Sequence, residues 1–264
     1  MQQKSTMIKK VCQYIFVSAI GFPLLFLLIL SLGKNWIFPN IIPVELSIGN
    51  WLSILSTEAN IVALFLNSLL LSTIVAILVT SFSFIISKSI AYSKNKTLYI
   101  LLAYIPYLLS PVIMAVLFHY FFIISNLTGT FFGVILAQFL VSFPFGIIIF
   151  ISFWTNKIKK IEDLSYTLGS SQKQTYIKII LPLSKHILQL CFFQIFLISW
   201  FEYGLTSIIG TGKIMTLTLS VFKYINEANI FYAAFASVLL VIPPMLLVYI
   251  NKKLLFFVEN NTIL

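Results

Sequence analysis

Few residues in this chain could do acid–base, nucleophilic or metal chemistry, because only 9% of the 264 residues are charged. His119 and His186 lie far apart in the sequence, and His119 has apolar neighbours. A lone histidine in such a place is more often a hydrogen-bonded structural residue than a base or a ligand. The Gly212-Lys213 pair is followed by Ile214, not by the Ser or Thr of the phosphate-binding pattern of a nucleotide hydrolase. We therefore predict a chain that is not an enzyme, with no catalytic residue, metal site or cofactor.

The longest polar interval within the apolar sequence covers residues 161–182. Its acids, Glu162 and Asp163, predict the beginning of a short helix, because the helix dipole favours negative charge at that end. Gly169 can adopt the left-handed conformation that ends a helix. A second short helix is expected before Pro182, since a proline disfavours helix in the residue that precedes it.

The spacing in this interval resembles the signature loop of the permease subunits of binding-protein-dependent ABC importers. That loop reads Glu-Ala-Ala, three residues, Gly, nine residues, then Ile-x-Leu-Pro, and the gap lengths match here without adjustment. The two alanines are replaced, and the acid is Asp preceded by Glu. The matched positions are Asp163, which Glu162 precedes, for the acid, Leu164 and Ser165 for the alanines, Gly169 for the glycine, and Ile179, Leu181 and Pro182 for the closing motif.

The composition excludes an ordinary soluble domain, because 60% of the residues are hydrophobic and the mean hydropathy is +1.04. Apolar runs of about 20 residues can cross the roughly 30 Å hydrocarbon core of a bilayer. Cys12 and Cys191 lie in such runs without metal-ligand spacing, and we expect buried thiols. The sequence predicts an all-α polytopic membrane protein, a single permease domain over residues 1–264. The predicted spans are about 11–32, 61–87, 97–125, 131–154, 184–209 and 230–250, with a coupling segment at 161–182 between spans four and five.

The lysines give these spans an orientation. Loops on the cytoplasmic side of a membrane carry an excess of basic residues, and all seventeen basic residues here are lysines. With both termini inside, only Lys34, Lys213 and Lys223 fall outside. The other fourteen, and the 161–182 segment, are then cytoplasmic. On the cytoplasmic side, an ATPase subunit could reach this segment.

Glu202 is the acid that the predicted fifth span contains. An ionised carboxylate inside a bilayer costs several kcal/mol unless it faces protein or water. Glu202 could therefore line a translocation path and meet a cationic solute. It could equally be an acid at the outer boundary that simply reaches water, and the sequence leaves both interpretations open.

The resemblance implies a division of labour between chains. The first short helix, about Ile161 to Leu168, would dock into a groove on an ATP-binding subunit, and Gly169 would allow the turn that follows. The chain would form half of a pore, with a second permease subunit, identical or homologous. Two ATP-binding subunits and an extracytoplasmic solute-binding protein would complete an importer in a bacterial plasma membrane. No nucleic acid is implied as a partner.

Within the family, the chain is similar to the six-span group that serves polyamines, aminoethylphosphonate, ferric iron, thiamine, sulfate and molybdate. A polyamine is favoured as the solute. The alternative is a secondary transporter without an ATPase partner, which would normally hold ionisable residues deep in its spans. The residues that carry the similarity are Asn67-Ser68, Ala91-Tyr92, Pro111, Pro144, Ser199, Glu202 and Thr216-Leu217.

Overall fold

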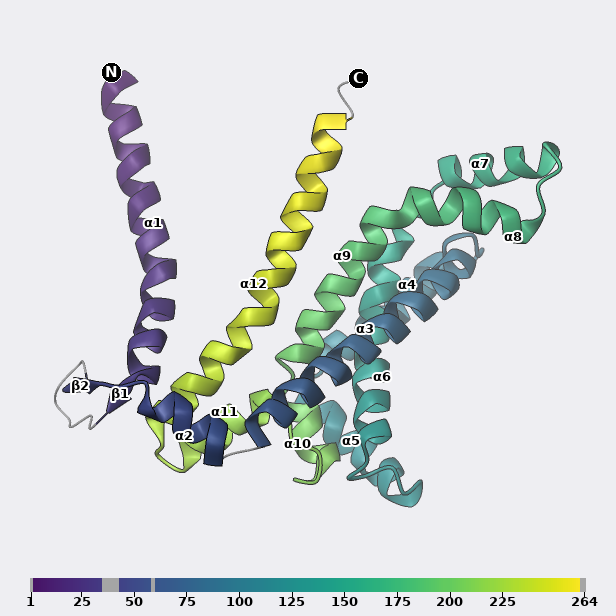
Figure 1. The fold of residues 1–264 in the computed structure, drawn as a ribbon. Coiled ribbons are helices and arrows are strands. Elements are labelled where there is room, and N and C mark those ends of the chain that lie inside the picture. The colour runs from purple at the N-terminus through teal and green to yellow at the C-terminus, as the bar shows by residue number, and fades with distance from the viewer. Residues whose placement is uncertain (1, 35–42, 58–59, 262–264) are drawn as a thin grey trace. The chain divides into compact units, whose positions relative to one another are not determined.

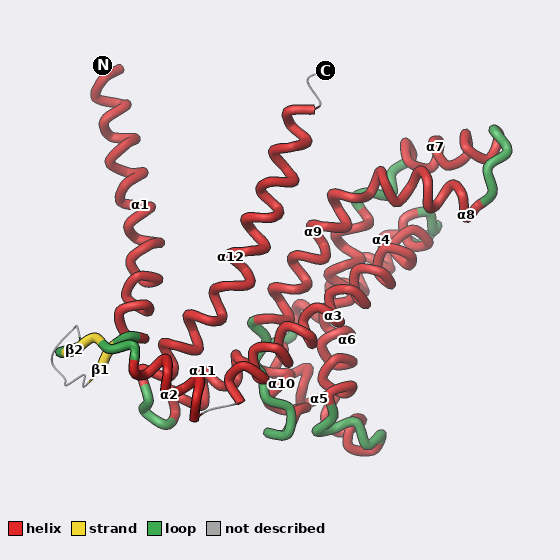
Figure 2. Tube along the Cα trace, viewed as in Figure 1, coloured by secondary structure: helices red, strands yellow, loops and turns green. Residues whose placement is uncertain are grey.

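The computed structural model describes residues 2–34, 43–57 and 60–261, and these fold almost entirely into helices (Figures 1 and 2). Five of the described helices are long and apolar enough to cross a membrane. The predicted all-α polytopic architecture is confirmed. These helices cover Cys12–Ser31, Ile61–Ala91, Phe131–Ile151, Gln172–Trp200 and Ile230–Tyr249.

The chain divides into two compact units. The first contains residues 1–65 and 217–248, and the second contains residues 66–216 and 249–264. Two long helices, α3 (Asn60–Ala91) and α12 (Ile230–Asn261), contribute residues to both.

The first unit is built around α1 and the beginning of α12. A two-stranded antiparallel pair follows α1, with Gly33 opposite Leu46. Within this unit the Trp51 ring packs edge-to-face on Phe235, with 4.9 Å between the ring centroids. The other elements are α1 (Gln2–Ser31), β1 (Gly33–Lys34), β2 (Glu45–Leu46), α2 (Gly49–Thr57) and α11 (Leu217–Asn226).

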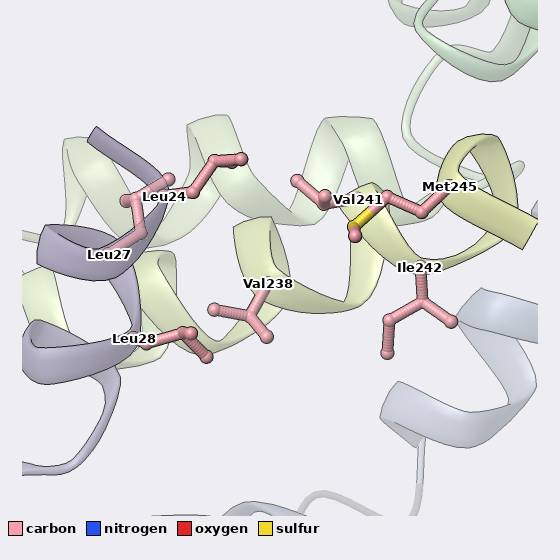
Figure 3. A pocket seen from close by; sticks show the side chains of 7 residues that line it. All are labelled: Leu24, Leu27, Leu28, Val238, Val241, Ile242 and Met245. Atoms are coloured by element: carbon pink, nitrogen blue, oxygen red, sulfur yellow. The ribbon is translucent and has the colours of Figure 1, made fainter. Parts of the chain in front are cut away.

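A cavity of about 350 Å³ lies between α1 and α12 of the first unit (Figure 3). All of its lining side chains are apolar. It offers no polar group that could bind a charged solute. The lining residues are Leu24, Leu27, Leu28, Val238, Val241, Ile242 and Met245.

The second unit holds the polar interval and most of the remaining helices. In it, α7 and α8 lie at the same end as the beginning of α4, whereas α5 and α10 lie at the opposite end (Figure 1). The α10 helix packs against α5 and α6. The elements after α3 are α4 (Lys96–Tyr104), α5 (Pro111–Ile124), α6 (Phe131–Ile151), α7 (Asn156–Thr167), α8 (Gln172–Thr175), α9 (Leu181–Trp200) and α10 (Gly204–Gly210).

The third predicted span is not one continuous helix. Between α4 and α5 the chain forms a short 3-10 helix, Ile105–Leu108, and then an extended stretch at Leu109 and Ser110. Pro106 removes a backbone donor, and Pro111 favours extended backbone in the residue before it. The Ser110 hydroxyl then caps α5 by accepting a hydrogen bond from the backbone of Val112.

The fifth predicted span is also interrupted near its end. The α9 helix stops at Trp200, and residues 201–203 form a turn before α10 begins at Gly204. A side chain at Gly204 would press on Val112 of α5, with its Cβ 2.8 Å from the Val112 Cγ2. A glycine is therefore what lets α10 lie close against α5.

Candidate functional site: the segment between α6 and α9

The first helix of the polar interval, α7, begins earlier than the sequence suggested. It begins at Asn156, and the hydroxyl of Thr155 accepts a hydrogen bond from the backbone of Ile158. The prediction that Glu162 and Asp163 open this helix is wrong, because they lie in its second half. The Thr155 cap and the burial of Ile158 in the first turn fix the beginning of α7 instead.

The end of α7 agrees with the prediction. Gly169 has φ of +84°, the left-handed conformation that a side chain disfavours, and its N–H donates to the Tyr166 carbonyl at 3.0 Å. A Cβ at Gly169 would meet no atom within 4 Å. The glycine is therefore required by backbone geometry, not by crowding.

The return into α9 differs from the expected stop at Pro182. Ser171 and Gln174 form a reciprocal capping box at the beginning of α8. A single wide π turn, Tyr176–Ile180, then leads directly into α9. Pro182 lies in the first turn of α9, so it does not end the helix. The wide turn leaves room for a ring that would otherwise clash with the carbonyl four residues earlier.

The predicted coupling residues divide into an outward and an inward set. Asp163, Leu164 and Gly169 are exposed, and so are Leu168 and Pro182. Successive residues of a helix point about 100° apart. Within α7, Asp163 and Leu164 therefore face outward, while Glu162 and Ser165 on either side of them face inward. The inward or partly covered members are Glu162, Ser165, Ile179 and Leu181.

Glu162 points into the protein. Its Oε1 accepts a hydrogen bond from Nζ of Lys88 at 2.5 Å and another from the hydroxyl of Tyr166 at 2.8 Å. Only 7% of Glu162 is exposed. Lys88 lies near the end of α3, so this ion pair joins two elements that are 74 residues apart in the sequence.

Two tyrosines near this carboxylate have a raised pKa. Partial burial, and then the hydrogen bond to Glu162, raise the pKa of Tyr166 above 10.0. The pKa of Tyr92, just beyond α3, is also raised, first by burial and then by the nearby charges of Glu162 and Asp163. Both shifts favour the neutral phenol, so these side chains remain hydrogen-bond donors at physiological pH.

Ser165 gives α7 a second internal anchor. Its hydroxyl lies 2.8 Å from the hydroxyl of Thr175 in α8, and it donates to the Glu162 carbonyl at 2.7 Å. Both Ser165 and Thr175 are buried. An alanine at this position could not make these bonds, so the serine ties α7 to the chain that enters α9.

A separate polar cluster surrounds Glu202. Its Oε1 accepts from the backbone N–H of Leu205 at 2.5 Å, and its Oε2 accepts from the backbone and hydroxyl of Thr206 at 2.8 and 2.6 Å. The Gln138 amide of α6 donates to the Thr206 hydroxyl at 2.9 Å and accepts from the Ser199 hydroxyl at 2.5 Å. Glu202 is half-buried and already bonded to the beginning of α10.

Sequence analysis did not find Lys88 or Gln138. Lys88 was counted only as a basic residue that follows a span, and no local signal indicates its pairing. For Gln138 a signal existed, because an amide inside an apolar run must find a partner. Among the described residues, no three His, Cys, Asp or Glu side chains cluster so as to hold a metal ion.

The fold and the polar segment define a class of protein: a helical membrane protein with a polar helix, α7, between the apolar helices α6 and α9. A family comparison is more specific. Residues 95–256, more than half of the chain, match the model of the family described as binding-protein-dependent transport system inner membrane component. The chain belongs to this family, whose permeases work with ATP-binding and solute-binding partners and are themselves non-catalytic. No curated protein matches the chain.

Proposed function

We propose that this chain forms half of the translocation pore of an ATP-driven importer and that α7 receives the force from an ATP-binding subunit. The observation that carries this proposal is the exposure of two leucines on a polar helix. Leu164 in α7 and Leu168 at its C-cap lie one turn apart and are 61% and 79% exposed, and Asp163 beside them is exposed too.

These leucines need a covering partner if α7 lies in water. Fully burying a leucine side chain is worth about 1.5–3 kcal/mol relative to leaving it exposed. Lys157, Lys159 and Lys160 are also exposed on α7, which supports the proposal that this helix lies in water on the cytoplasmic side. An apolar groove on a soluble subunit, with a donor for Asp163, would suit this surface.

The assembly that we propose contains two permease subunits, identical or homologous, and two ATP-binding subunits. The lysine distribution supports cytoplasmic termini in a bacterial plasma membrane. Closure of the ATP-binding subunits would draw the two copies of α7 together. The α8–α9 connection is continuous helix through Pro182, so it would carry this movement into the bundle without a flexible joint.

The transported compound is a small solute delivered by an extracytoplasmic binding protein, and a polyamine is the first candidate. Glu202 supports a cationic solute only through its carboxylate charge, since the atoms of that carboxylate bond to α10. Uptake of labelled spermidine, sulfate and molybdate into cells that express the complete operon would separate the candidates. Uptake of either anion with none of spermidine would overturn the polyamine proposal.

The central test is recovery of an ATP-hydrolysing subunit with the tagged chain from gently solubilised membranes. Gly169→Arg should abolish this recovery and solute uptake, because a bulky side chain in the left-handed conformation distorts the end of α7. Gly212→Arg is the matched control, since Gly212 also has a positive φ, +74°, and open space around it. Recovery of the wild-type chain alone, without ATPase activity, would overturn the importer proposal and favour a secondary transporter.

A further inference from the structure

The ion pair between Lys88 and Glu162 lies where α7 meets α3. Side-chain exposure is 28% for Lys88 and 10% for Glu162, so both charges are largely removed from water. A charge that loses its partner in such a place is costly, whereas the intact pair is close to neutral in energy. The pair therefore specifies the position of α7 more than it stabilises the fold.

Aromatic groups surround this ion pair and connect the same two elements. The Trp154 indole N–H donates to the Ser87 hydroxyl at 2.9 Å, and its ring lies 5.5 Å from Nζ of Lys88. The Phe84 ring of α3 packs on Trp154, with 5.0 Å between the ring centroids. One turn of α3, residues 84–88, thus contacts both Trp154, which precedes α7, and Glu162 in the second half of α7.

A further contact continues this connection beyond the end of α3. The Tyr92 hydroxyl donates to the Thr155 carbonyl at 3.3 Å, and Nζ of Lys159 lies 5.5 Å from the Tyr92 ring centroid. Thr155 is the residue that caps α7. The beginning of α7 and Glu162 in its second half are therefore tied to α3 or its continuation by polar contacts.

We propose that Glu162 is a positioning residue that links α7 to α3, and is not itself a contact of the ATP-binding subunit. This inference rests on the function proposed above. When a partner moves α7, the Glu162–Lys88 pair delivers the displacement to α3, while the Ser165–Thr175 contact delivers it toward α9. The α7 helix thereby acts on two apolar helices at once, and the partner contact is left to Asp163 and the exposed leucines.

The experiment uses the complete transporter in membranes and measures three quantities: co-purified ATP-binding subunit, ATP hydrolysis, and solute uptake per ATP hydrolysed. Glu162→Gln and Lys88→Gln should keep the subunit bound and active, but lower uptake per ATP about tenfold, a typical coupling between distant sites. The double variant Lys88→Glu with Glu162→Lys should restore most of the uptake per ATP. Lys94→Gln is the matched control, since Lys94 is an exposed lysine near the same end of α3.

Each outcome decides a different point. Unchanged uptake per ATP in Glu162→Gln would overturn the inference, as would failure of the charge exchange to restore uptake while both single variants remain well inserted. Loss of the bound subunit in Glu162→Gln, with Lys88→Gln unaffected, would make Glu162 a partner contact.

Tyr166→Phe removes the other donor to the same oxygen of Glu162 and should lower uptake per ATP less than Glu162→Gln. Absence of any ATP-binding subunit from the wild-type preparation would instead overturn the function on which the inference rests.

Discussion

Glu202 caps the helix that begins two residues after it, and Thr206 supplies two of the three bonds. The carboxylate accepts hydrogen bonds from both the backbone and the hydroxyl of Thr206, at 2.8 and 2.6 Å. The sequence left Glu202 open as a residue of the translocation path or as an acid at the outer boundary, and the structure gives it a helix-capping role. The two roles can be separated by experiment.

Glu202→Ala should lower the melting temperature of the purified chain, because it leaves the backbone N–H groups of Leu205 and Thr206 without their acceptor. An unsatisfied, partly buried donor costs about 1–3 kcal/mol. Thermal unfolding in detergent measures this change. Glu227→Ala is the control, because Glu227 is exposed and its carboxylate lies 3.9 Å from Nζ of the exposed Lys223. An unchanged melting temperature together with an altered KM for uptake would make Glu202 a solute contact instead of a cap.

Leu168→Ser should weaken binding of the ATP-binding subunit about tenfold and leave the stability of the chain unchanged. Leu168 is 79% exposed, so the substitution removes little packing within the chain, while loss of one well-buried apolar contact in a complex costs about 1–3 kcal/mol. Binding of the purified subunit to the reconstituted chain measures the effect. Ile225→Ser, at a 54% exposed residue of α11, serves as the control. Equal binding by both variants would argue against the α7 surface as the docking site.

The break between α4 and α5 should be accessible to water. Non-helical backbone at membrane depth is tolerated only where protein covers it or a water-filled cavity meets it. The nine residues of α4 span about 14 Å, so if α4 begins at the membrane surface, the break after it would lie well inside a roughly 30 Å core. Leu108, which is 82% exposed, therefore marks a place where we expect the pathway to approach the helix.

Leu108→Cys, in a background with Cys12 and Cys191 replaced, should react rapidly with a charged methanethiosulfonate in membranes that contain the complete transporter. Leu117→Cys in the regular part of α5 is the control, at a residue that is 54% exposed. Equal, slow labelling at both positions would place the break against lipid or protein and remove it from the pathway.

Tyr166 should ionise only above pH 10. Because burial and the Glu162 bond raise its pKa, the neutral phenol is favoured in the folded chain, and the bond contributes its stability below pH 10. This contribution is lost as the pH rises through the raised value. Absorbance titration at high pH should therefore show that Tyr166→Phe removes a late-ionising phenol from the twelve tyrosines. Loss of a phenol that titrates at or below pH 10 would contradict the hydrogen bond to Glu162.

The sequence by itself determined the features that depend on composition and local geometry. Long apolar runs require membrane-crossing helices, which fixed the all-α class, and the match at Gly169 correctly located the left-handed residue that ends α7. The family follows from the same linear spacing, because a docking loop is a continuous stretch of chain.

Only the tertiary structure decided which way each polar side chain points. Glu162 and Asp163 are neighbours in sequence, yet one pairs with Lys88 inside the protein and the other faces outward. Glu202 accepts its hydrogen bonds from the first turn of α10. That helix exists as a separate element because α9 ends at Trp200. Pairing across 74 residues depends on how helices pack, and no local preference encodes it. The same apolar runs would be compatible with many packings, so the partners of the few charged and amide groups could be found only in the folded chain.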